Sequence, residues 1–199
     1  MRRRLVDIVA AVVLLVIAAP LLAFGMIAVL VGSGRPIFFG HRRLGRDGRP
    51  FECWKLRTMK IDAEDQLEVH GQLRTEYRQN GFKIPTDRDP RVTRVGRVLR
   101  RTYVDELPQL VNVLGGSMSL VGPRPIVEDE LDCFGEDSQE LLSHTPGLFG
   151  EWTSLGRDRP PYPERARLEM EYLRNRSLAR DVRILLRSIP VVLRGQGGG

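Results

Sequence analysis

The pattern of apolar and polar residues first predicts a long N-terminal helix. Residues Ile8 to Val31 carry no charge, and at about 1.5 Å per residue such a helix can cross a hydrocarbon core of about 30 Å. Pro20 lies near its middle, where a proline removes a backbone hydrogen bond and bends a helix. We therefore expect a membrane-inserted segment over residues 1–34 and a globular part over residues 35–199.

Positive charge flanks this segment on both sides. Basic residues stay on the cytoplasmic side of a membrane, so a bent helix that enters and leaves on one face satisfies both flanks. A kinked helix that spans the bilayer is the second topology, and the residues alone leave both open. The flanking arginines are Arg2, Arg3 and Arg4 before the segment and Arg35, Arg42, Arg43, Arg46 and Arg49 after it.

The globular part begins with a predicted β-hairpin over residues 36–57, whose turn is Gly45-Arg46-Asp47-Gly48. A polar helix over residues 61–80, a proline-containing loop over residues 83–90 and an amphipathic helix over residues 92–99 follow. Next comes a helix near Val104, which Thr102 would cap. We expect Gly115-Gly116 to end it, and two more helices over residues 126–142 and 164–176.

Residues 178–193 are predicted to form a basic amphipathic helix, which suits either an anionic bilayer surface or the protein core. Gly195 to Gly199 would be a flexible tail. The fold class expected is α+β, mainly helical with a small β-hairpin, a re-entrant N-terminal membrane helix and interfacial amphipathic helices.

Composition narrows the partners. The net charge of +6 favours anionic ligands such as nucleic acid, acidic lipids or phosphorylated substrates. Nucleic-acid binding is disfavoured, because only 7% of residues are aromatic and most arginines flank specific motifs. Cys53 and Cys133 form no CxxC pair, so we expect ordinary thiols in a reducing compartment, without a disulfide or structural zinc.

The most informative run for chemistry extends from Arg101 to Pro125, and Arg100 directly precedes it. It joins two adjacent carboxylates, Asp105 and Glu106, to a basic cluster at Arg100 and Arg101 and to a stiff turn, Gly122-Pro123-Arg124-Pro125. Guanidinium groups bind phosphate in bidentate fashion, which indicates a phosphate-handling site. The residues alone also allow a carboxylate pair that only stabilises a helix terminus, and arginines with structural or solvated roles.

Four motifs carry a resemblance to a known family: KLRTM (residues 55–59), DPRVTRVGRVLRRT (89–102), VDELPQLVNVLGGSMSLVGPRP (104–125) and IPVVLRG (189–195). They resemble the bacterial sugar transferases, which are small monotopic phosphoglycosyl transferases. The similarity runs from about Arg3 to Gly195. The chain departs from the family pattern at Ala19-Pro20, where many members have Ser-Pro, and at residues 148–154.

The resemblance implies a two-step reaction on the cytoplasmic face of the bacterial inner membrane. An aspartate attacks the β-phosphate of a UDP-sugar, UMP leaves, and polyprenyl (undecaprenyl) phosphate then takes the phosphosugar, which starts glycan assembly. It implies Asp105 as nucleophile and Mg²⁺ ligand, and Glu106 as its catalytic partner. Arg100, Arg124 and Arg101 would bind phosphate, while Pro20, Pro123 and Pro125 would support their motifs.

A non-catalytic, membrane-anchored basic module that binds anionic lipid or nucleic acid is the alternative that the composition allows. The partners expected are a UDP-sugar, polyprenyl phosphate and membrane lipid. Neither the sugar, the glycan pathway nor homo-oligomerisation can be read from the sequence.

Overall fold

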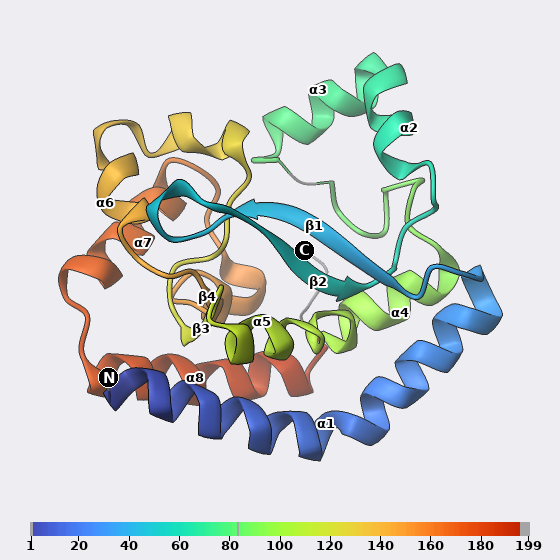
Figure 1. Cartoon of the computed structure of the whole chain (residues 1–199). Helices are drawn as coiled ribbons and strands as arrows, with labels where there is room; N and C mark the ends of the chain where they lie inside the picture. The colour runs from blue at the N-terminus through green and yellow to red at the C-terminus, as the bar shows by residue number, and fades with distance from the viewer. Residues whose placement is uncertain (1, 83, 196–199) are drawn as a thin grey trace.

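The computed structural model describes residues 2–82 and 84–195, so residues 196–199 of the expected tail lie outside the described part. Helices surround a short β-hairpin (Figure 1). The helices are α1 (Arg2–Ser33), α2 (Ala63–Val69), α3 (Gly71–Gln79), α4 (Arg94–Arg101), α5 (Gln109–Gly115), α6 (Ser138–Leu142), α7 (Glu164–Arg174) and α8 (Leu178–Leu193). The strands are β1 (Phe38–Leu44), β2 (Pro50–Leu56), β3 (Ser119–Val121) and β4 (Gly147–Phe149). The expected α+β, mainly helical class is confirmed.

The predicted hairpin is present, and its turn lies where the glycines indicated. Strands β1 and β2 pair antiparallel from Phe38 opposite Leu56 to Leu44 opposite Pro50. Asp47 and Gly48 in the turn have φ values of 58° and 71°, a left-handed conformation that glycine adopts without steric cost. The hairpin lies in the centre of the molecule in Figure 1, where its strands can carry side chains into a site.

Helix α1 is continuous and bent, and both of its ends are bound to the globular part. Figure 1 shows it changing direction below the other elements, and Pro20 lies inside it. Near its start, Arg4 donates to the backbone carbonyls of Val113 and Leu114 at the end of α5. Beyond its end, Arg57 donates to the carbonyl of Gly34 at 2.8 Å. Within the described residues, α1 is the one helix long and apolar enough to cross a membrane.

Most of the apolar surface of α1 is not covered by protein. Val16 and Ile17 are 69% and 70% exposed, whereas Ala11 and Val29 are completely buried against the globular part. The helix thus packs against the globular part along a narrow stripe, and its remaining broad apolar face is exposed. An apolar face of this extent is typical of membrane or partner contact.

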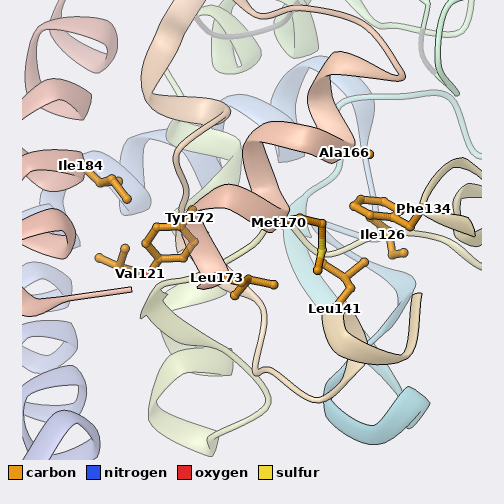
Figure 2. Close-up of a cluster of buried hydrophobic side chains, with 9 residues drawn as sticks. All are labelled: Val121, Ile126, Phe134, Leu141, Ala166, Met170, Tyr172, Leu173 and Ile184. Atoms are coloured by element: carbon orange, nitrogen blue, oxygen red, sulfur yellow. The ribbon is translucent and has the colours of Figure 1, made fainter. Parts of the chain in front are cut away.

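The largest core cluster lies under α7 and α8. Figure 2 shows Tyr172, Met170 and Leu173 of α7 among the side chains of this cluster, with Ile184 of α8 close by. Helix α8 has the bounds that its pattern predicted. It buries Ile184 and Val191 but leaves five apolar side chains at least half exposed, so it presents one face to the core and another outward; these are Leu178, Val182, Leu186, Ile189 and Leu193.

The prediction of a helix capped by Thr102 is wrong. Thr102 instead follows the last residue of α4, and the N-cap of α4 is Thr93, whose hydroxyl accepts from the Gly96 amide at 2.9 Å. The chain then reverses at Tyr103, whose φ of 57° is left-handed. A capping threonine has an extended backbone, so the turn at Tyr103 leaves no capping role for Thr102.

Two other expectations need correction, and one strand pair was not predicted. The polar helix over residues 61–80 is broken at His70, whose extended backbone separates α2 from α3. The acidic stretch over residues 126–142 is mainly 3₁₀ helix, with only Ser138–Leu142 as α-helix. The parallel pair β3–β4 was not expected, because three-residue strands are too short to show an alternating pattern.

Candidate active site

The two adjacent carboxylates lie on a 3₁₀ turn between α4 and α5, Val104–Glu106. This turn begins at the left-handed Tyr103, and Pro108 separates it from α5. Asp105 is buried, with 5% of its surface exposed. Buried carboxylates are rare unless they are paired or functional, so its position marks Asp105 as a functional candidate.

Glu106 forms an ion pair with Lys55 of β2. The Lys55 Nζ donates to Glu106 Oε1 at 2.7 Å, and about a fifth of each side chain is exposed. Lys55 belongs to the KLRTM motif. Because it lies on the hairpin, 51 positions before Glu106, tertiary folding brings this cation to the dyad. The ion pair fixes the position of the Glu106 side chain beside Asp105.

Asp105 is less acidic than an ordinary aspartate. Burial raises its pKa to about 6. The Lys55 ammonium acts in the opposite direction, Glu106 raises the pKa further as a like charge, and Arg100 lowers it. A carboxyl group with this pKa is ionised at neutral pH but poorly solvated, which suits a nucleophile toward phosphorus.

Arg100 enters the site from the last turn of α4. Its Nε donates to the Thr58 hydroxyl at 2.9 Å. Burial lowers the pKa of Arg100, while the Asp105 carboxylate raises it. The approach is close because Gly96 packs on this segment: a Cβ there would lie 2.0 Å from the Thr58 carbonyl oxygen. The glycine therefore lets α4 approach the segment after β2 that carries Thr58.

Arg124 is presented by the proline turn, which β3 and β4 hold in place. The Gly122 amide donates to the Phe149 carbonyl at 2.9 Å, and the Gly147 amide donates to the Pro123 carbonyl at 2.8 Å. The strands meet closely, since a Cβ on Gly147 would lie 2.0 Å from the Gly122 nitrogen. The backbone on either side of Arg124 is thus fixed, as the rigid turn predicted.

A cavity of about 370 Å³ joins these groups. Asp105, Glu106, Lys55, Arg100 and Arg124 all line it. Further cationic and aromatic side chains that sequence reasoning missed as site residues also line it, among them Arg43, Trp152, Arg159 and Arg165. A cavity with this many cations around one carboxylate dyad is suited to a polyanionic ligand.

Three arginine side chains of the cavity surround the ring of Trp152. The guanidinium carbons of Arg124, Arg159 and Arg165 lie 5.7, 5.0 and 4.5 Å from its ring centroid. Arg165 also donates to Glu130 at 2.7 Å, yet its Nε and NH2 are buried without a hydrogen-bond partner among the described residues. Such a cluster of buried cations is stabilised when an anion binds.

His41 is a neutral side chain in the same cavity. Burial lowers its pKa to about 2, and Arg43, Lys55, Arg124 and Arg100 lower it further by repulsion. The imidazole is therefore uncharged at neutral pH. His41 lines the same cavity, so it offers a hydrogen-bonding group there without adding another positive charge.

The remaining predicted site residues occupy different places. Arg101 is mostly exposed and pairs with Asp87 at 2.9 Å, away from the groups described above. Pro123 and Pro125 flank Arg124 in the turn, and the Pro125 carbonyl accepts from Arg43 at 3.4 Å. Pro20 lies within α1. The structure thus brings Arg100 and Arg124 to the dyad and leaves Arg101 on the surface.

The sequence signal for the missed residues was weak. Lys55 alternates with apolar neighbours as any half-exposed strand residue does, and only the KLRTM resemblance marked it. Arg159 and Arg165 lie in and after a proline-rich loop, where arginines are common on surfaces. Their convergence on Trp152 depends on tertiary folding, which local patterns do not encode.

The carboxylates of the dyad can bind a magnesium ion if phosphate and water supply its other ligands. Among the described residues, no group of three or more His, Cys, Asp and Glu side chains is placed to hold a metal. Magnesium typically takes one or two protein carboxylates and leaves its other positions to water and phosphate. Asp105 with its neighbour Glu106 meets that smaller requirement.

Comparison with known proteins identifies the family. The model of the bacterial sugar transferase family matches residues 1–195. The chain belongs to this family. It is 39% identical over 198 residues to an exopolysaccharide production protein, ExoY, of Rhizobium meliloti (strain 1021), covering 99% of this chain and 88% of the relative. The resemblance inferred from the four motifs is therefore confirmed, as is the class of enzyme.

Other relatives carry more specific names. An undecaprenyl-phosphate galactose phosphotransferase of Salmonella typhimurium is 40% identical over 198 residues, 98% of this chain but 41% of the relative. A UDP-glucose:undecaprenyl-phosphate glucose-1-phosphate transferase of Caulobacter vibrioides is 38% identical over 207 residues, 97% of this chain and 70% of the relative. The bacterial sugar transferase described here thus spans about two fifths of some relatives and most of others.

Proposed function

We propose that this sugar transferase moves a sugar-1-phosphate from a UDP-sugar to polyprenyl phosphate and releases UMP. The observation that carries the proposal is the buried Asp105 beside Glu106 in a cavity lined by cationic side chains. The names of the relatives support a UDP-sugar donor and undecaprenyl phosphate as acceptor. Through these names we also infer a role in starting exopolysaccharide or related glycan assembly.

In the first proposed step, an oxygen of the Asp105 carboxylate attacks the β-phosphorus of the UDP-sugar. The bond from that phosphorus to the bridging oxygen breaks, and UMP leaves with the electron pair. In the second step, a phosphate oxygen of the polyprenyl phosphate attacks the same phosphorus. The Asp105 carboxylate is then released, and a lipid diphosphate that carries the sugar is formed.

The other residues would position and neutralise these phosphates. Arg100 and Arg124 reach the cavity from two elements, so they would bind the diphosphate from different directions. Lys55 would orient Glu106 through their ion pair. Mg²⁺, held by Asp105 and by Glu106 beside it, would offset phosphate charge when bound.

The bent helix α1 supports a location at a membrane surface. Both ends of α1 are bound to the same globular part, which favours the re-entrant topology over a spanning helix. We infer that its exposed apolar face enters the bilayer, and that residues 35–195 lie on the cytoplasmic face. This placement would let a soluble donor and a lipid acceptor reach one site. A non-catalytic basic module would have no need for a buried dyad.

One assay tests the proposal. Purified protein is incubated with a UDP-sugar panel, Mg²⁺ and undecaprenyl phosphate, and UMP is measured. We expect UMP with at least one donor and a fall of about 10³-fold or more for Asp105→Asn. Asp87→Asn is the matched control, because Asp87 lies on the surface with Arg101. Full activity of Asp105→Asn, or a wild type inactive with every donor, would refute the proposal.

The covalent step needs its own measurement. Wild-type protein incubated with donor alone should show the mass of a phosphosugar on the peptide that contains Asp105. Its absence under conditions in which UMP forms only with acceptor present would indicate direct transfer instead.

A further inference from the structure

A second, smaller cavity of about 140 Å³ adjoins the dyad. Tyr103 and Glu106 line both this cavity and the large one. Most of the other side chains around the small cavity are apolar. They come from α1, from the two sides of the dyad, from β4 and from α8: Leu21, Val104, Leu107, Leu148, Phe149, Val191 and Val192. The large cavity thus contains the clustered cationic side chains, the small one is lined mainly by apolar side chains, and the two meet at the turn that carries the dyad.

The small cavity belongs to the same region as the apolar surface of α1 and α8. Leu21, which lines it and follows Pro20, is 51% exposed. On α8, Val191 and Val192 line the cavity, while the neighbouring Ile189 and Leu193 are 53% and 81% exposed. An apolar ligand that reaches this cavity from a bilayer would thus remain in contact with apolar side chains.

We propose that this cavity, named here the acceptor slot, holds the isoprene unit next to the phosphate of the lipid acceptor. This inference rests on the proposed function. The size is suitable, since an apolar cavity of about 150 Å³ stays dry and binds benzene, and an isoprene unit has one carbon fewer. With its first unit in the slot, the acceptor would present its phosphate at Glu106, where the two cavities join.

The arrangement separates the two substrates by chemistry. The donor diphosphate fits the cationic cavity, whereas the hydrocarbon of the acceptor fits the apolar slot. The acceptor slot would also keep water away from the phosphosugar on Asp105 while the lipid approaches. It would therefore favour transfer to the lipid over hydrolysis.

Filling the slot tests this assignment. Ser188 lines it, is buried, and donates to the Ile184 carbonyl of its own helix at 2.8 Å. For Ser188→Leu we expect the KM for undecaprenyl phosphate to rise about tenfold, with the KM for the UDP-sugar and UMP formation at saturating acceptor unchanged. Ser188→Ala, which leaves the slot open, should keep the wild-type KM for the acceptor.

A second pair of variants guards against misfolding of the first. Val192→Phe adds a ring inside the slot, and Leu178→Phe adds the same ring type at an exposed position of α8. Only Val192→Phe should raise the KM for the acceptor, and a wild-type KM for the UDP-sugar shows that the fold is intact.

Three outcomes overturn the inference. The first is an acceptor KM unaffected by both filling variants in a wild type that is active. The second is a parallel rise in the KM of donor and acceptor, which would place the effect on the dyad. The third is a filling variant that binds membranes more weakly than the wild type but has an unchanged acceptor KM in detergent. This result would indicate that an acyl chain of the bilayer occupies the slot. A wild type inactive with every donor would instead refute the proposed function, and the acceptor slot with it.

Discussion

Lys55 is the cation with the largest effect on the Asp105 pKa. It pairs with Glu106 at 2.7 Å and lowers the pKa of the neighbouring Asp105, whereas burial and Glu106 raise that pKa. Burial, opposed mainly by the Lys55 charge, thus raises the Asp105 pKa to about 6. Because only the carboxylate can attack phosphorus, the ionisation of Asp105 controls the first proposed step.

The kcat/KM for UMP formation should therefore fall as the pH drops through about 6. Glu106→Gln removes a like charge, which lowers the Asp105 pKa and moves this acid limb to lower pH. Lys55→Met removes a cation, which raises the pKa and moves the limb to higher pH. The profiles are measured at constant Mg²⁺, with Glu128→Gln as an exposed control. Shifts in the reverse directions would contradict the assignment.

Glu169 carries a second buried carboxyl group that affects stability. One of its oxygens accepts from the Arg124 amide at 3.3 Å, and the other is buried without a partner among the described residues. Burial raises its pKa to about 7. The folded chain therefore holds a proton that the unfolded chain releases near pH 4.5. The resulting stabilisation is present at low pH and is lost as the pH rises through about 7.

Glu169→Gln should remove this pH dependence. At pH 8 the variant is expected to unfold at a higher temperature than the wild type, with a gain on the order of 2 kcal/mol. At pH 5 the difference should be small. Glu164→Gln, on the exposed side of α7, serves as the control. Equal melting temperatures of variant and wild type at pH 8 would contradict the prediction.

At the level of elements, local patterns predicted α8 and the hairpin but not the turn that carries the dyad. Thr93 and Thr102 both precede stretches with apolar residues, and nothing local distinguishes them as caps. The left-handed Tyr103 decides between them. Lys55 and Glu106, 51 positions apart, meet only because the hairpin packs beside this turn. The dyad could be read from the sequence, but its electrostatic partners depend on tertiary contacts.

The packing of α4 can be tested at Gly96. Gly96→Ala would place a methyl group 2.0 Å from the Thr58 carbonyl oxygen, and backbone cannot move aside easily. We expect a loss of stability of about 3 kcal/mol and weaker donor binding, because Arg100 would move with α4. Gly71→Ala is the matched control, since nothing lies within 4 Å of a Cβ there. Equal thermal stability of the two variants would contradict this packing.

For the whole molecule, the decisive question is how α1 meets the membrane. Its first turns are bound to the body of the protein: Arg4 contacts the end of α5, and Asp7 accepts from the Ser119 hydroxyl at 2.8 Å. Its other end is bound through Arg57. A helix that crossed the bilayer would have to break one of these two attachments. The folded body therefore favours both ends on one side, as the flanking arginines also indicate.

Cysteine labelling tests this topology. In a chain with Cys53 and Cys133 replaced by serine, single cysteines are placed at Arg3, at Arg35 and, as reference for the globular part, at Gly71. Inside-out vesicles treated with a membrane-impermeant maleimide should label all three positions, and intact spheroplasts should label none. Labelling of Arg3→Cys from the outside alone would establish a spanning helix. Because Gly71 lies on an exposed helix away from α1, its labelling also shows which face the catalytic cavity occupies.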